Sequence, residues 1–506
     1  MHYVSNRLYI KDKPENEDLI KRFVEKCTFY KVPLFKNQVN DPGWSSTERF
    51  YGCSEGWYVF PRGMTRHLDD SHFSVNVKSV PAKYKLSGKI KLGAPGYEHQ
   101  PGAVKTFYEK LISLKNKVGI LCSPCGTGKT IMGGFLIKML SQKTLILVDQ
   151  DFLLSQWEES LESIFSGINI QKNTLDSVGN IDVFTIQHFL QKDKMADYNR
   201  YGLVIVDETH IVPALRFSSV VSMLSPKFLV GLSATPFRDD GKTSMLHDFM
   251  GSILYRVENA SLMIPDVNMI ATGEDYSDTK IFIFRNKKAA ASQYRNKLIT
   301  HYAVNDVAGG RKILVLTTTV KHCETLKKYF DNAGLRSCVL HSKGVRKNPL
   351  KRITKSTNLE LRTKGEIIED FNNGVFDIII ATQIADKGMD VPLIDAAYLT
   401  IETDAKSKLE QRIGRALRKK KHAPIIRDFW DADMIKKVSR NPFKNFRCFK
   451  SDKAKSRARY YTENMNWPVK WTMTRKMVDL IDRVKKGELR QWIESKLKKK
   501  SQKSKP

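Results

Sequence analysis

The chain has 506 residues and a mass of 58.0 kDa, which is too long for one hydrophobic core and predicts two to four domains. Its 85 Lys and Arg against 54 Asp and Glu give a net charge of +31, far more than solubility requires, so the expected partner is a polyanion such as nucleic acid. Seven irregularly spaced Cys, no leader-like start and no membrane-length apolar run argue against a disulfide-rich secreted protein and a membrane protein. We expect a soluble, cytoplasmic protein with no membrane partner, as a monomer or a weak oligomer.

Residues 1–84 alternate short extended runs with one helical stretch and predict a small α+β accessory domain. The helical stretch lies near Asn16–Tyr30, where Leu19, Phe23 and Cys27 would share one face. This segment contains no catalytic constellation. Contact of its basic and aromatic residues with nucleic acid is one alternative, and packing or simple solvation of these residues is the favoured one.

Residues 85–263 are expected to form the first large domain. Apolar, strand-like runs alternate with amphipathic stretches there, at Val118–Leu121, Thr144–Val148, Val183–Ile186, Leu203–Val206 and Phe228–Leu232. Buried parallel strands read as apolar runs, so this alternation is typical of a doubly wound parallel sheet.

The stretch after the first of these runs is a candidate phosphate loop. Small residues at Ser123, Gly126 and Gly128 would let backbone N–H groups approach phosphate oxygens, and Lys129 would add a cation for the β- and γ-phosphates. The Thr130 hydroxyl could ligate Mg²⁺. The strict pattern has Gly where Ser123 stands, and an ordinary strand-to-helix turn is the alternative. The nucleotide-binding set is Ser123, Pro124, Cys125, Gly126, Thr127, Gly128, Lys129 and Thr130.

A pair of carboxylates follows the run Leu203–Val206. Carboxylates at the carboxyl end of a central strand face the ligand crevice of a doubly wound sheet. Asp207 is therefore expected to hold Mg²⁺ through water, and Glu208 to polarise the attacking water.

With Gly231–Pro236, these segments resemble the superfamily 2 helicases and translocases of the DEAH-like type. Ser123–Thr130 is similar to motif I, Asp207–His210 to motif II and Ser233–Thr235 to motif III. The resemblance extends over about residues 95–430 and implies ATP and Mg²⁺ as cofactors.

The continuation through Phe237–Lys242 and Leu246–Gly251 resembles the narrower XPB-type and tailed-phage branched-DNA helicases. That resemblance places Gln100 at the adenine base. It also places the segments Gln150–Trp157 and Thr185–Gln187 where the first lobe of that family touches the nucleic-acid backbone, with Gln156, Thr185 and Gln187 as the implied contacts. The implied coupling residues are Ser233, Ala234 and Thr235.

Residues 264–440 are expected to form a second α/β lobe after a polar linker at about Ile264–Thr279. Its strand-like runs are Ile313–Leu316, Ser337–Leu340, Asp377–Ile380 and Ala397–Ile401. The segments Ala381–Pro392 and Gln411–Arg418 resemble motifs V and VI. The residues implied there are Gly388 and Asp390 at the nucleotide, Thr317 and Thr382 at the nucleic acid, and Gln411, Arg415 and Arg418 in catalysis. Arginines from a second lobe would stabilise charge developing on the γ-phosphoryl group.

Residues 441–506 form a basic C-terminal extension, with 20 Lys and Arg against 6 Asp and Glu and a net charge of +14. Trp467, Trp471 and Trp492 lie among these charges, either as stacking platforms for bases or packed on the second lobe. The last eleven residues read as a disordered basic tail.

The sequence thus predicts an α/β protein with two tandem RecA-like doubly wound parallel-sheet lobes, a small α+β N-terminal domain and a basic C-terminal extension. The resemblance implies an ATP-dependent helicase or translocase acting on single-stranded and branched DNA, in repair, recombination or replication, in a phage, virus or bacterial host. An RNA helicase and a duplex translocase are alternatives, as is a nucleotide-switched nucleic-acid scaffold.

Overall fold

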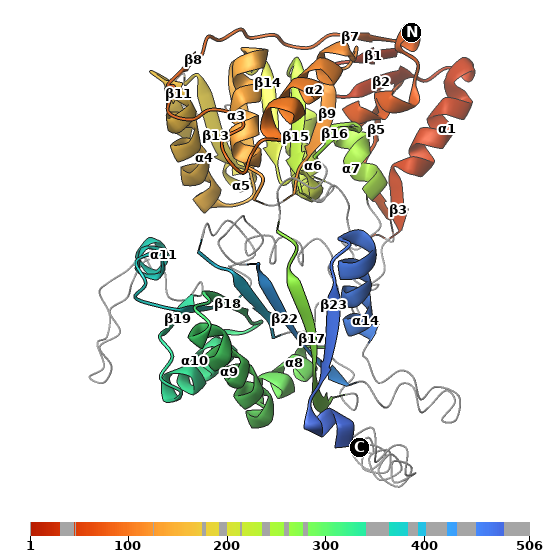
Figure 1. Ribbon diagram of the computed structural model, residues 1–506. Coiled ribbons are helices and arrows are strands. Elements are labelled where there is room, and N and C mark those ends of the chain that lie inside the picture. The colour runs from red at the N-terminus through yellow and green to blue at the C-terminus, as the bar shows by residue number, and fades with distance from the viewer. Residues whose placement is uncertain are drawn as a thin grey trace, which may run out of the picture. The chain divides into compact units, whose positions relative to one another are not determined.

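Figure 1 shows the structure of the protein, a computed structural model. The structure describes residues 2–30, 45, 47–124, 126–174, 179–191, 200–212, 215–234, 243–257, 263–276, 282–340, 364–382, 393–400, 423–432 and 452–479. The chain divides into two compact units, Met1–Ser261 and Leu262–Pro506. Each unit is built on a seven-stranded sheet whose described strand pairs are all parallel, which confirms the two doubly wound lobes.

The sheet of the first unit has the order β12-β13-β10-β14-β15-β9-β16. Its strands are β12 (Ile170–Lys172), β13 (Ile181–Thr185), β10 (Thr144–Val148), β14 (Leu203–Asp207), β15 (Phe228–Ser233), β9 (Val118–Cys122) and β16 (Ile253–Arg256). The five predicted strands are present, with ends within two residues of the prediction. The two edge strands, β12 and β16, were not predicted, because each is short and only partly buried.

Helices cover both faces of this sheet. Alternate residues of β10 enter separate cores, with Leu145 and Leu147 on one face and Ile146 and Val148 on the other. The second of these faces is covered by α2 (Gln100–Ser113), α3 (Lys129–Leu140) and α4 (Asp151–Ile164). The first is covered by α5 (Ile186–Gln191), α6 (Leu215–Met223) and α7 (Thr243–Met250). Because both faces are buried, the strands read as unbroken apolar runs.

The N-terminal region forms a second, five-stranded sheet of order β5-β6-β2-β1-β7. Its strands and helix are β5 (Gly52–Ser54), β6 (Trp57–Phe60), β2 (Leu8–Lys11), β1 (His2–Val4), β7 (Phe73–Val75) and α1 (Glu17–Lys26). The predicted helix ends earlier than expected, since β3 (Thr28–Tyr30) pairs with β4 (Thr47–Arg49). Phe23 and Phe60 lie in one apolar cluster with Leu147 and Phe249 of the first lobe, so the two sheets share a core.

Arg62, in the 3-10 helix η3 (Arg62–His67), attaches this region to the first lobe. Its guanidinium is fully buried and donates to Asn116 Oδ1 at 2.7 Å and to the carbonyl oxygen of Pro226 at 2.6 Å. Burial lowers the pKa of Arg62 to about 9, still high enough for a charged side chain at neutral pH. The next residue, Gly63, has no room for a side chain, since a Cβ there would lie 2.6 Å from the backbone oxygen of Asp248.

The second unit has the sheet order β19-β20-β18-β21-β22-β17-β23. Its strands are β19 (Ser337–Leu340), β20 (Ile378–Ala381), β18 (Ile313–Leu316), β21 (Ala396–Leu399), β22 (Ile425–Ala432), β17 (Asp266–Asp275) and β23 (Val469–Met473). The interpretation of Ile264–Thr279 as a polar linker was wrong over most of its length, because β17 is the longest described strand of this sheet. Its polar residues are paired: Thr272 donates to Asp431 Oδ1 on β22.

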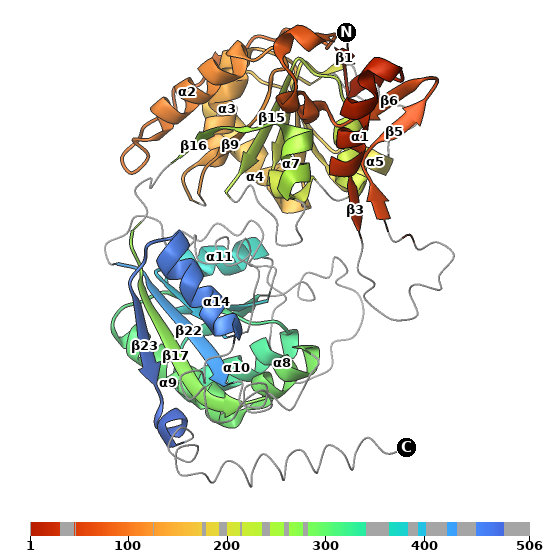
Figure 2. The same ribbon diagram turned by 90° about the vertical axis from the view of Figure 1, so that its right-hand side faces the viewer.

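Two layers of helices also cover this second sheet. Its helices are α8 (Phe282–Ala291), α9 (Gln293–Ala308), α10 (Val320–Asn332), α11 (Lys364–Asn372), α14 (Asp452–Arg459) and the π-helix η10 (Tyr460–Asn464). The helices α9 and α10 pack on one face, and α11, α14 and η10 on the other (Figure 2). Trp467 is buried in the second of these cores and Trp471 packs against it, so the packing alternative holds for both. Across the described parts of both units, no helix is long and apolar enough to cross a membrane.

His322 on α10 gives the second unit a predicted sensitivity to acid. The side chain is buried, and its Nε2 lies 3.2 Å from Asn296 Oδ1. Burial, assisted by the Arg295 cation, lowers the pKa of His322 from 6.5 to about 3. The unfolded chain therefore binds this proton first as the pH falls. The contribution of neutral, buried His322 to the free energy of unfolding is complete above about pH 6.5. It is lost towards pH 3, at about 1.4 kcal/mol per pH unit.

Urea unfolding at about pH 7.5 and about pH 5 measures this effect. Between these values we expect the parent protein to lose about 2 kcal/mol more stability in the second unit than the variant His322→Gln loses. The variant His301→Gln, at an exposed position on the neighbouring α9, is the matched control and should follow the parent. Identical pH dependence of the parent and His322→Gln would contradict the assignment.

Candidate active site

The loop between β9 and α3 has the backbone of a phosphate cradle. Gly126 and Gly128 adopt left-handed conformations with φ of 83° and 79°, and α3 begins at Lys129 directly afterwards. The φ of Gly128 favours glycine, and a Cβ there would also displace the side-chain amide of Gln100. Inside the loop, the hydroxyls of Ser123 and Thr127 are hydrogen bonded to each other. The strict phosphate-loop pattern has glycine at the position of Ser123, and here the Ser123 side chain forms a hydrogen bond within the loop.

Two side chains from the start of α2 hold this loop from the other side. Gln100 is buried and donates from Nε2 to the backbone oxygen of Thr127 at 3.1 Å. His99 Nε2 lies 3.1 Å from the same oxygen. The residue predicted to contact adenine is thus placed directly against the phosphate loop.

Lys129, Asp207 and Glu208 come together at the carboxyl end of the first sheet. Lys129 Nζ lies 3.7 Å from Glu208 Oε1, and both side chains are mostly buried. Glu208 follows β14 with φ of 50°, a left-handed conformation that is strained for a non-glycine residue and typical of functional sites. Its backbone N–H donates to Asp207 Oδ1 at 2.9 Å, and its second carboxylate oxygen lies 3.4 Å from His210 Nδ1.

The Asp207 carboxylate is electrostatically perturbed. Burial and then the neighbouring Glu208 carboxylate raise the pKa of Asp207 to about 6, and the Lys129 cation partly opposes them. Trp157 on α4 donates from Nε1 to Asp207 Oδ2 at 3.0 Å. A carboxylate with a raised pKa next to a lysine and a glycine-rich loop indicates a functional site.

Hydrogen bonds tie together the three strand ends that carry these motifs. The backbone N–H of Ser123 donates to the oxygen of Ser233 at 2.9 Å, which connects β9 with β15. The Thr209 hydroxyl donates to the backbone oxygen of Leu232 at 2.8 Å, which connects the carboxylate segment with β15. Among the described residues, no partner is found for the fully buried Ser233 hydroxyl.

The donor set fits a magnesium nucleotide. The left-handed loop offers backbone N–H groups and Lys129 offers a cation, as polyphosphate requires. The described residues contain no group of three or more His, Cys, Asp or Glu arranged for a metal ion. Asp207, the Thr130 hydroxyl and nucleotide oxygens would supply the oxygen ligands that Mg²⁺ prefers.

The predicted nucleic-acid contacts of the first unit differ in exposure. Gln187 on α5 is exposed, and Gln156 on α4 is half-buried. The Thr185 side chain is buried, and its hydroxyl lies 2.7 Å from His188 Nδ1. In the second unit, Thr317 and Thr382 follow the adjacent strands β18 and β20, and the Thr317 hydroxyl lies 2.9 Å from Cys323 Sγ. All five roles remain predictions.

Several predicted residues lie outside the described part of the chain. They are Cys125, Thr235, Gly388, Asp390, Gln411, Arg415 and Arg418. Their roles rest on the sequence alone.

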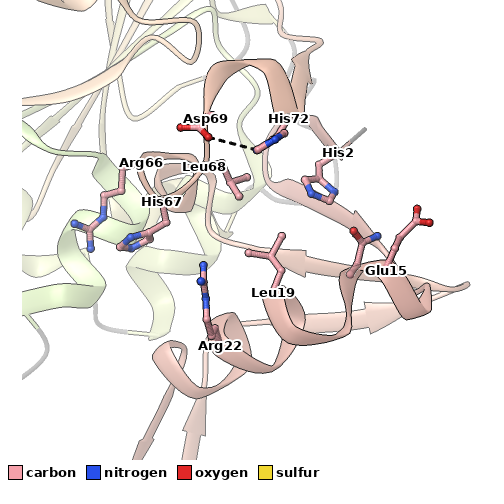
Figure 3. Close-up of a pocket in the computed structure, with 10 residues that line it drawn as sticks. His2, Glu15, Leu19, Arg22, Arg66, His67, Leu68, Asp69 and His72 are labelled. Atoms are coloured by element: carbon pink, nitrogen blue, oxygen red, sulfur yellow. Dashed lines mark ion pairs between the residues drawn. The ribbon is translucent and has the colours of Figure 1, made fainter.

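A cavity of about 590 Å³ lies elsewhere, in the N-terminal region (Figure 3). Burial lowers the pKa values of His2 and His67 within it, so both rings are neutral at pH 7. The Arg66 guanidinium on its rim pairs at 2.8 Å with the buried Asp248 of α7. The lining residues are His2, Glu15, Asn16, Leu19, Arg22, Arg66, His67, Leu68, Asp69 and His72, and none belongs to the predicted site.

The resemblance placed Trp157 in a stretch expected at the nucleic acid and His99 next to the adenine-contacting Gln100, but the sequence did not identify the contacts that these two residues make in the site. Trp157 contacts a carboxylate 50 positions further along the chain, and His99 contacts a loop 28 positions away. Neither spacing corresponds to a local motif, so no signal in the sequence could have identified these contacts.

Known protein families match the segments that contain the candidate site and much of the second unit. The profile of the type III restriction enzyme res subunit matches residues 94–238, and that of the helicase conserved C-terminal domain matches residues 293–420. A protein of Sulfurisphaera tokodaii named DNA 3'-5' translocase XPB2 is 25% identical over 360 residues, which are 65% of this chain and 80% of the relative. The putative helicase 161L of Invertebrate iridescent virus 6 is 30% identical over 235 residues, 42% of this chain and 51% of the relative.

Among solved structures, a variant of S. cerevisiae Dbp5 bound to RNA and ADP BeF3 matches with a TM-score of 0.50 and 15% identity. The match covers 78% of this chain and 98% of that protein. At this identity it supports the fold alone. The chain spans most of the archaeal relative but only about half of the viral one.

Proposed function

Because the chain belongs to the superfamily 2 helicases, we propose that it is an ATP-driven motor that unwinds or remodels DNA, with branched or forked DNA as its preferred substrate. The observation that carries this proposal is the cluster of Lys129, Asp207 and Glu208 beside a left-handed glycine loop. Such a site holds a polyphosphate and places a carboxylate where water can be activated.

We assign the chemical roles within this cluster as follows. The loop N–H groups and Lys129 bind the phosphates, and Asp207 and Thr130 hold the magnesium ion, which supplies charge neutralisation at the phosphoryl group. Glu208 orients and polarises the attacking water. Arg415 and Arg418 are proposed to complete the site from the second lobe.

The choice of DNA rests on charge and on the family. The net charge of +31 favours a nucleic-acid backbone, whose neutralisation releases counterions. The archaeal relative is named as a DNA translocase, and the second profile is a helicase domain. RNA is the alternative substrate, and the protein is proposed to act as a monomer or weak oligomer.

A comparison of polymers tests the proposed function. We expect ATP hydrolysis by the full chain to be stimulated by single-stranded and forked DNA more strongly than by RNA of the same sequence. In single-turnover assays, forked DNA should be unwound faster than linear duplex with an identical loading tail, because opening each base-pair step costs about 1.4 kcal/mol in stacking and a fork presents strands already parted. Equal rates would indicate translocation without a preference for branches, and stimulation by RNA alone would indicate an RNA helicase.

A further inference from the structure

The Asp207 carboxylate is held at both oxygens. Oδ1 accepts the backbone N–H of Glu208 at 2.9 Å, and Oδ2 accepts the indole N–H of Trp157 at 3.0 Å. Each carboxylate oxygen has a further lone pair, so both bonds leave room for a cation or water. Together they restrict rotation of the carboxylate about its Cβ–Cγ bond.

The indole itself is fixed from several sides. Trp157 is only 1% exposed and lies on α4, which packs against α3, the helix that begins at Lys129. On α3, a Cβ at Gly133 would lie 2.8 Å from the indole Cη2, so the absence of a side chain there makes the space for the ring. The indole is therefore enclosed between α4 and the helix that begins at Lys129.

The same helix extends towards the predicted nucleic-acid residues. Gln156 precedes Trp157 on α4, and Asp151 at the first position of α4 lies 3.8 Å from His188 Nδ1. His188 in turn contacts the Thr185 hydroxyl at 2.7 Å. A displacement of α4 by a bound strand would thus move the donor that holds Asp207.

We propose that Trp157 is a positioning residue that orients the Asp207 carboxylate for its divalent cation and links that orientation to helix α4. This inference rests on the proposed function, because it assumes that Asp207 serves a magnesium nucleotide. Groups that donate to a metal-binding carboxylate orient it, and their removal typically lowers metal affinity or activity about 10- to 100-fold.

The variant Trp157→Phe removes the donor and retains an aromatic ring. We expect the Mg²⁺ concentration for half-maximal ATP hydrolysis to rise about 10-fold, with the KM for ATP at saturating Mg²⁺ nearly unchanged. Trp430→Phe is the matched control, because Trp430 is equally buried in the other unit and no partner of its indole N–H is found among the described residues. An unchanged Mg²⁺ requirement in a folded Trp157→Phe variant would overturn the proposal.

A measurement without turnover covers the case in which Trp157→Phe does not fold. The full ¹⁵N-labelled chain has seven indole N–H resonances, one for each Trp. One of them should shift in the variant Asp207→Asn without metal, and the same resonance should shift when Mg²⁺ and ADP are added to the parent. If no indole resonance responds to Asp207→Asn, the hydrogen bond does not exist and the inference fails. Absence of nucleic-acid-stimulated hydrolysis in the parent protein would instead refute the proposed function, whatever the spectrum shows.

Discussion

The variant Glu208→Gln is expected to lower the kcat of ATP hydrolysis by about 10²- to 10⁴-fold and to leave ATP binding nearly unchanged. The amide keeps the size of the carboxylate but cannot accept a proton from water. The left-handed backbone at Glu208 and the 3.7 Å distance from its Oε1 to Lys129 Nζ place this side chain in the site. Measured binding of a fluorescent ATP analogue separates this effect from loss of the nucleotide.

The variant Lys129→Ala should have a different kinetic effect from Glu208→Gln. It removes the cation that contacts the phosphates in the ground state and in the transition state, so affinity and kcat should fall together. The matched control for both is Glu109→Gln, on the exposed face of α2, which should hydrolyse ATP at the parent rate. Near-parental hydrolysis by Glu208→Gln would refute the assignment of this carboxylate.

The variant Arg457→Met is expected to destabilise the second unit by about 3–5 kcal/mol. Arg457 on α14 donates twice to the fully buried Asp428 of β22, at 2.7 Å and 2.8 Å, and Tyr461 donates to the same carboxylate at 3.0 Å. Without Arg457, the carboxylate charge stays buried and loses its ion pair. The loss is a large share of the roughly 5–15 kcal/mol that stabilises a typical domain. Thermal unfolding followed by circular dichroism measures it.

Three further chains test this prediction. The variant Arg459→Met, at an exposed position on the same helix, should unfold at the parent temperature. A chain ending after residue 479 keeps α14, η10 and β23 and should fold, whereas one ending after residue 440 loses all three and should lose the cooperative unfolding of the second unit. A stable second unit in the shorter chain would show that these residues are dispensable.

The sequence predicted the five central strands of the first lobe because their residues are buried on both faces. β10 and β14 are continuous apolar runs in the sequence and are fully buried in the structure. β17 escaped prediction for the opposite reason, since Asn268, Thr272 and Gly273 interrupt its apolar pattern. Its polar groups are stabilised by residues distant in the chain, including Asp431 and Thr472, which only the folded structure brings near.

In the candidate site, too, the residues of local motifs could be predicted from the sequence, and contacts between distant residues could not. The phosphate loop and the Asp207–Glu208 pair were recognisable because their chemistry depends on consecutive residues that follow a strand. Contacts across the fold were not recognisable, such as the indole of Trp157 on Asp207 and the amide of Gln100 on the loop. The Arg457–Asp428 pair belongs to this second class, so the sequence left open whether the C-terminal basic region packs on the second lobe.

The attachment at Arg62 determines how force would pass through the first unit. A domain joined by a flexible linker would move independently of the first lobe. The N-terminal sheet instead shares an apolar core with the first lobe, and the buried hydrogen bonds of Arg62 also join the two. The N-terminal region is therefore expected to move with the first lobe as one body.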